Sequence, residues 1–332
     1  MGKKLKFIPE LESLRGLAAV SVLAFHTFDM RIDTTVTGLA PVVLFFVLSG
    51  FVLARSLEND PSVRNFFLGR LFRLLPPAAA CVLLLTALHW AFGFYVGFQG
   101  SFTPLNVLLN ALMIRSDING VMWSMTVECF ASPLILLSFL VYRWRGAVPL
   151  ITASVVLFGL SFWGGYAHLL GGVTNLAPLY AFVIGVLLHF LSLDGRRPGA
   201  FSAIAAAAIF VFCALRKQTA PLILMETLSS GLLILAIAGA PSSSIFSVLR
   251  LPPIRLLGRV SYSFYLLHPI GLALANRLSG DSWLSLFSFG LLFTLPIAWV
   301  SWRLVERPFV AIGRSSRHPP RVDTPVDSQS PA

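Results

Sequence analysis

Two ionisable side chains, His26 and Glu128, lie inside long apolar segments of this 332-residue chain. At about 1.5 Å per residue, His26 lies roughly 16 Å beyond Arg15, which is at the inner end of its segment. Glu128 lies roughly 10 Å below Val121, which is at the outer end of another segment. In a hydrocarbon core of about 30 Å the two depths are similar. A carboxylate paired with an imidazole would orient the ring and favour its protonated form, which suits a general base.

Each of these groups also has an ordinary structural explanation. A lone buried histidine can be a packed polar residue whose ring bonds to a backbone carbonyl, and this alternative stays open for His26. Arg15, Arg70 and Arg73 lie at segment ends, where guanidinium groups could hold phosphates through paired donors. Arginines at the cytoplasmic ends of segments are equally what membrane topology predicts. The residue types alone leave both readings open.

The composition fixes the class of protein that must position these residues. Hydrophobic residues make up 56% of the chain and charged residues only 12%, whereas soluble domains carry about a quarter charged residues. Leu74–Gly97 and Val121–Val141 are each long enough to cross a bilayer. We therefore predict an all-α polytopic membrane protein. Its net charge of +11 is interpreted as basic cytoplasmic loops, so we expect no nucleic-acid partner.

Ten apolar segments have spanning length, and a shorter one, 104–114, is expected to lie at the interface. The ten are roughly 14–30, 38–55, 74–97, 121–142, 147–166, 176–192, 200–215, 221–240, 261–279 and 283–302. With the N-terminus in the cytoplasm, 20 of the 25 lysines and arginines fall on the inner side, which predicts that both termini are cytoplasmic. Residues 1–312 are expected to form the membrane domain. Residues 313–332, rich in Pro, Ser and charge, are expected to be a disordered cytoplasmic tail.

Six sequence blocks, in order, resemble the bacterial acyltransferase 3 family of membrane acyltransferases. They are PELESLRGLAAVSVLAFHTF with Arg15 and His26, LFFVLSGFVLARS with Phe45–Phe51, NFFLGRLFRLLPP with Arg70, Arg73 and Pro76, MWSMTVECF with Trp123, Ser124 and Glu128, SYSFYLLHP with Ser261, Tyr262, Tyr265 and His268, and VERPF with Glu306 and Pro308. The blocks extend over residues 8–309. One departure is Cys129, which stands where the family commonly has a second carboxylate.

The resemblance implies transfer of an acyl group, typically acetyl, from cytoplasmic acyl-CoA to a hydroxyl of a surface or exported glycoconjugate. It implies a location in the bacterial cytoplasmic (inner) membrane, with the bilayer, a glycoconjugate or another hydroxyl acceptor, and acyl-CoA as partners. We expect no permanently bound cofactor. The three cysteines lack metal-ligand spacing, so we expect no metal site.

The resemblance also suggests roles for nine residues. His26 would act as the base or accept the acyl group itself, and Glu128 would orient or charge-balance it. The remaining residues would bind the donor: Arg15, Arg70 and Arg73 its phosphates, with Trp123, Ser124, Tyr265 and His268 along its path. No residue is identified as an oxyanion stabiliser. A transporter or flippase of a lipid-linked saccharide is the alternative that also explains buried charge, although we find no repeat of the first half in the second.

Overall fold

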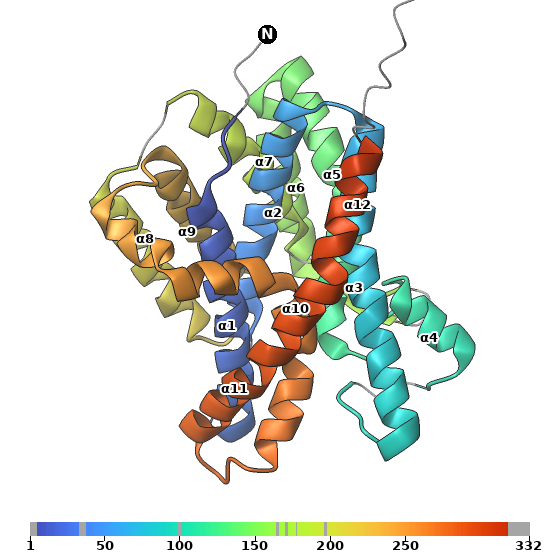
Figure 1. The fold of residues 1–332 in the computed structure, drawn as a ribbon. Coiled ribbons are helices and arrows are strands. Elements are labelled where there is room, and N and C mark those ends of the chain that lie inside the picture. The colour runs from blue at the N-terminus through green and yellow to red at the C-terminus, as the bar shows by residue number, and fades with distance from the viewer. Residues whose placement is uncertain are drawn as a thin grey trace, which may run out of the picture.

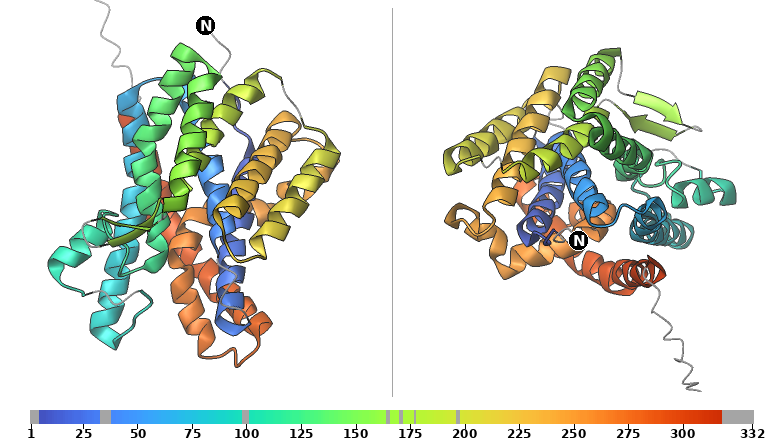
Figure 2. Two further views of the ribbon diagram at one scale, coloured as in Figure 1. Left: turned by 180° about the vertical axis from the view of Figure 1, so that it is seen from behind. Right: turned by 90° about the horizontal axis from the view of Figure 1, so that it is seen from above.

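The computed structural model describes residues 5–32, 38–97, 101–163, 166–169, 172–176, 178–195 and 198–317. Most of these residues are helical, which confirms the expected all-helical class. A short antiparallel hairpin, β1 (Tyr166–Leu169) and β2 (Gly172–Asn175), lies at the edge of the helices (Figure 2).

The longer helices form the body of the molecule (Figure 1). They are α1 (Pro9–Arg31), α2 (Leu39–Asn59), α3 (Val63–Phe92), α5 (Trp123–Arg145), α9 (Ala220–Gly239), α10 (Pro252–Asn276) and α11 (Trp283–Ser301). The shorter ones are α4 (Pro104–Ala111), α6 (Ala147–Leu160), α7 (Leu179–Leu193), α8 (Ala200–Ala214) and α12 (Arg307–Arg317). The 3-10 turns are η1 (Gly120–Met122), η2 (Ser161–Trp163) and η3 (Ser244–Arg250), and a π-helical turn, η4 (Trp302–Glu306), joins α11 to α12.

Five helical stretches of the described residues are long and apolar enough to cross a bilayer: α2, α3, η1 with α5, α9, and the continuous α11–η4–α12. Helices α6, α7 and α8 are apolar but shorter. These features mark a multi-pass membrane protein. Each of the ten predicted spans corresponds to a helix, and the short segment 104–114 contains α4.

Helix α3 begins earlier than the sequence suggested, at Val63 rather than residue 74. Ser62 caps it, because its hydroxyl accepts a hydrogen bond from the backbone N–H of Asn65 (3.3 Å). The basic stretch containing Arg70 and Arg73 is therefore helical and continuous with the apolar run. At the other end of the chain, α12 extends to Arg317, into the segment 313–332 that was expected to be a tail. The rest of that segment lies outside the described residues.

Two pairs of glycines let helices approach closely where the site is built. Gly16 of α1 packs directly against the backbone of Gly258 of α10, and a Cβ on either residue would overlap the facing chain. Gly50 of α2 and Gly185 of α7 meet in the same way. Small residues at crossings are how membrane helices gain close van der Waals contact. The first pair lies near the start of two parallel helices.

The far end of the same two helices is held by polar contacts. Arg31 Nη2 donates to Asn276 Oδ1 (2.5 Å) and to the carbonyl of Gly280 (2.9 Å). Helix α11 packs along both α1 and α10, with Leu23, Phe264 and Leu286 in a shared apolar cluster. The histidines of α1 and α10 lie between the glycine contact and this polar end.

Candidate active site

Two histidine rings stack where α1 meets α10. The ring centroids of His26 and His268 are 5.3 Å apart and their planes differ by only 18°. His268 is fully buried, whereas His26 keeps part of its surface accessible. The structure thus brings together two residues that were expected to have separate roles, one as catalytic base and one on the donor path.

A proline next to His268 decides which of its nitrogens carries the proton. Pro269 lies inside α10 and has no N–H to give to the carbonyl of Tyr265, four residues earlier. His268 Nδ1 lies 2.6 Å from that carbonyl oxygen. A carbonyl can only accept, so Nδ1 carries the hydrogen and the lone pair is on Nε2. Nε2 is buried and has no hydrogen-bond partner among the described residues, so a neutral base is held in a defined orientation.

Tyr265 connects the same turn of α10 to the start of α5. Its hydroxyl lies 2.8 Å from Ser124 Oγ and donates to the carbonyl of Val121 (3.0 Å). Trp123, next to Ser124, packs edge-on against Phe46. The place where α10 meets the start of α5 therefore holds three residues predicted along the donor path: Trp123, Ser124 and Tyr265. It lies one helical turn from His268.

Glu128 has a different partner from the one expected. Its Oε1 is 2.9 Å from Arg70 Nη2 and accepts a hydrogen bond from Ser49 Oγ (2.8 Å). Arg70 also donates to Ser132 Oγ (3.2 Å). The predicted pair of His26 with Glu128 is wrong in this structure. Two residues at a similar depth need not face each other, because the rotation of each helix about its axis decides where its side chains point.

The carboxylate that acts electrostatically on His26 is Asp29, on the same helix. Sequence reasoning missed it, although a spacing of three residues places the two side chains on neighbouring positions of a helix face. That spacing was the available signal. Asp29 keeps part of its surface accessible and lies near the C-terminal end of α1.

A second buried cluster joins α1, α3 and η4. Glu306 accepts a hydrogen bond from Ser263 Oγ (2.8 Å), and its charge interacts with those of Arg73 and Arg15. Arg15 also interacts with Glu128, so the two clusters are continuous. Sequence reasoning assigned no role to Glu306. The available signal was the block VERPF, which contains Glu306. In the structure a π-helical turn, a form often found at functional sites, carries Glu306 inward.

Three arginines and three carboxylates meet in this combined cluster: Arg15, Arg70, Arg73, Glu12, Glu128 and Glu306. Arg70 is paired directly with Glu128. Arg15 and Arg73 form no ion pair of this kind within the part of the chain that the structure describes. Guanidinium groups in such surroundings favour an anion with paired oxygens.

The chain is similar to known proteins along most of its length. The profile of the Acyltransferase domain family matches residues 8–303, almost the whole chain. A Staphylococcus aureus protein provisionally named an O-acetyltransferase is 24% identical over 92% of this chain and 58% of its own length. Acyltransferase MdmB of Streptomyces mycarofaciens is 27% identical over 82% of this chain and 81% of its own.

A further relative is named for its substrate. Peptidoglycan O-acetyltransferase OatA of Listeria monocytogenes is 24% identical over 91% of this chain and 56% of its own length. The chain thus spans little more than half the length of the Staphylococcus and Listeria relatives. No solved structure matches the chain at a significant level.

Proposed function

This chain belongs to the acyltransferase 3 family. From that premise we propose that it is an O-acyltransferase, which moves an acyl group, typically acetyl, from cytoplasmic acyl-CoA to a hydroxyl of a surface or exported glycoconjugate. The acceptor class is supported by the name of the Listeria relative, which acts on peptidoglycan. The observation that carries the chemical proposal is the stacked pair of His26 and His268 deep among the helices.

The reaction needs a base and a path for one proton. The acceptor hydroxyl attacks the thioester carbonyl, His26 takes the hydroxyl proton, and the C–S bond breaks as the new C–O bond forms. The departing CoA sulfur then takes the proton from His26, so the ring returns to its neutral form. Asp29 balances the charge on His26 while it is protonated.

His268 positions this base. Its Nδ1–H is fixed on the Tyr265 carbonyl, so the ring is neutral and packs as a flat face against His26. Its free Nε2 lone pair can accept a hydrogen from substrate or from an ordered water. Ser124 and Tyr265 define the wall beside it.

The donor phosphates would be held by Arg15 and Arg73, which form no direct ion pair within the part of the chain that the structure describes. We assign Arg70 a structural role first, because Glu128 already engages it. Glu128 accordingly acts on the donor site through Arg70 and Arg15 rather than on His26.

The membrane arrangement in this proposal has ten spans, with both termini in the cytoplasm of a bacterium and the domain in its inner membrane. The charge asymmetry supports it, and each expected span has a helix. Ser316, exposed near the end of α12, should be inaccessible from outside. Labelling of a Ser316→Cys variant by an impermeant thiol reagent in intact cells would refute this orientation, and labelling only after permeabilisation would support it.

The decisive experiment measures CoA release by the purified, monodisperse protein supplied with acetyl-CoA and a membrane glycolipid. Release that depends on the glycolipid, with acetyl found on a hydroxyl by mass spectrometry, is the expected result. A transporter or flippase would release no CoA. Release that requires no glycolipid and leaves it unmodified would overturn the acceptor class while keeping the donor.

A further inference from the structure

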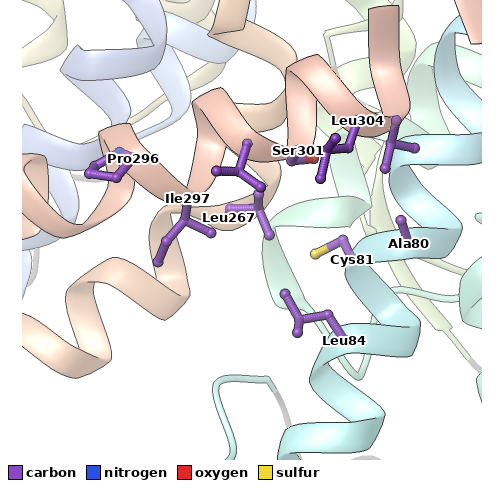
Figure 3. A pocket seen from close by; sticks show the side chains of 10 residues that line it. Ala80, Cys81, Leu84, Leu267, Pro296, Ile297, Ser301 and Leu304 are labelled. Atoms are coloured by element: carbon purple, nitrogen blue, oxygen red, sulfur yellow. The ribbon is translucent and has the colours of Figure 1, made fainter. Parts of the chain in front are cut away.

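An apolar pocket of about 410 Å³ opens between α3 and the α11–η4 stretch (Figure 3). Ala80, Cys81 and Leu84 of α3 line one side. Leu267 of α10 lies between that side and the other (Figure 3). The other side is supplied by six residues of α11 and η4: Pro296, Ile297, Val300, Ser301, Leu304 and Val305. The volume lies within the range of small-molecule sites. Almost every lining side chain is apolar.

The rim of this pocket faces outward from the bundle. Leu84, Val300 and Leu304 line the pocket and are also exposed on the surface. In a membrane protein, an exposed apolar surface of a spanning helix meets hydrocarbon. A pocket that opens on that surface can take a hydrocarbon chain from the side. Apolar contact alone gives little preference there, because lipid tails are as apolar as leucine.

Polar recognition is available at one end of the pocket. Arg303 lies beside the ring of Trp299 (5.8 Å from Cζ to the centroid), and Arg307 lies in the same way beside Trp302 (5.7 Å). Tryptophan and arginine together are typical of the bilayer interface. Both arginines are exposed, and neither forms an ion pair within the part of the chain that the structure describes.

The geometry links this basic end to the apolar pocket. Leu304, on the pocket wall, is flanked by Arg303 and lies three residues before Arg307, about one helical turn away. A molecule with a hydrocarbon tail in the pocket would therefore have its polar end at these guanidinium groups. Two positive charges at that point match a phosphate ester.

We propose that the pocket and Arg303 with Arg307 form a binding site for one anionic membrane phospholipid, with an acyl chain between α3 and α11 and its phosphate on the two arginines. Neither histidine of the stacked pair lines the pocket, although the lining residue Leu267 directly precedes His268 in α10. The proposal does not depend on the identity of the acyl donor or acceptor. Because η4 forms part of the pocket wall and also carries Glu306, the bound lipid would hold this π-helical turn in place.

The test is native mass spectrometry of the full chain in detergent, titrated separately with phosphatidylglycerol and with phosphatidylcholine of the same chains. The parent should bind one phosphatidylglycerol in preference to phosphatidylcholine. A basic residue near a membrane surface is worth about fivefold in affinity for anionic lipid. Arg303→Gln combined with Arg307→Gln should therefore remove most of that preference.

Two variants that fill the pocket from opposite walls, Ala80→Trp and Val300→Trp, should lower binding of both lipids. The matched controls are Arg314→Gln, an exposed arginine on α12, and Leu228→Trp, an exposed leucine on α9; both should behave as the parent. If the Trp variants do not fold, the arginine pair alone decides the proposal.

Equal binding of the two lipids by the parent would overturn the proposal. So would an unchanged preference in the double arginine variant, or an equal loss in Arg314→Gln, which would indicate general attraction to basic α12. Displacement of phosphatidylglycerol by a polyprenyl phosphate or a long-chain acyl-CoA at equal concentration would assign the pocket to a substrate tail instead.

Discussion

The region around α1, α5 and α10 and the region around α7 and α9 each bury a histidine and a glutamate, but they surround them differently. Glu128 is held by Arg70 and Ser49, and His268 has one nitrogen fixed and one free. Glu226 of α9 receives a single hydrogen bond, from Gln218 (2.9 Å), and its second oxygen has no partner in the described structure. His189 of α7 has no hydrogen-bond partner on either nitrogen there.

This contrast shows that burial of an ionisable group does not by itself indicate a reaction centre. His189 packs edge-on against the ring of Phe51, so its surroundings are those of a packed aromatic residue. The histidines of α1 and α10 instead lie beside each other. The charge of Asp29 acts on His26, and a pair of hydroxyl groups lies one helical turn from His268. We expect function to follow this distinction.

The largest effect should come from the histidine of α1. His26→Ala should lower acyl transfer by about 10²–10⁴, the usual contribution of a positioned base, while acyl-CoA binding remains. His189→Ala is the matched control, since it removes a buried imidazole that lacks this environment, and it should keep most of its activity. Turnover and donor affinity are measured on monodisperse protein. A folded His26→Ala retaining more than about a tenth of parental turnover would move the base to His268.

The next largest effect should be on stability. Arg70→Ala leaves Glu128 as an unpaired buried charge and should lower the free energy of unfolding by about 3–5 kcal/mol. Adding Glu128→Gln should recover part of the loss, because the unpaired charge disappears. Glu226→Gln should change stability much less. Thermal unfolding in one detergent compares the variants, and equal losses of stability in Arg70→Ala and Glu226→Gln would erase the contrast between the regions.

A smaller effect, on kcat, is expected for Pro269, which leaves the Tyr265 carbonyl free to hold the ring of His268. Pro269→Ala restores an N–H that competes with His268 for the Tyr265 carbonyl. Loss of one orienting hydrogen bond should reduce kcat by about tenfold. The melting temperature should not fall, because alanine suits a helix interior better than proline. A variant with both kcat and melting temperature unchanged would show that this hydrogen bond does not matter for turnover.

The smallest effect concerns the donor. Arg73→Ala should raise KM for acyl-CoA by about tenfold, as expected for one lost charged hydrogen bond, and Arg73→Lys should recover only part of it. Arg143→Ala, which breaks an exposed ion pair with Glu58, is the control. If KM follows Arg143 and not Arg73, the buried cluster serves structure alone.

Sequence reasoning located the helices and most of the site, for a clear physical reason. Apolar runs define segments, and polar residues within them are few, so His26, Glu128 and His268 were conspicuous. The rotation of each helix was not available from depth, which is why Glu128 was paired with His26 instead of Arg70. Asp29 was overlooked because it lies near the end of its apolar segment, where a charged residue is ordinary and does not by itself indicate a function. The tautomer of His268 could not be predicted, because it depends on the contact of Nδ1 with the Tyr265 carbonyl that Pro269 leaves free, and only the structure shows this contact.

The close contact of Gly16 with Gly258 has a consequence for how this protein can change. The histidine of each helix follows its glycine by ten residues, His26 after Gly16 and His268 after Gly258. The glycine contact therefore sets a common register for the two helices. A single residue inserted between the glycine and the histidine of one helix would turn that histidine ring by about 100° and shift it by about 1.5 Å. The same insertion in both would displace the rings together, so viable length changes here should occur in pairs.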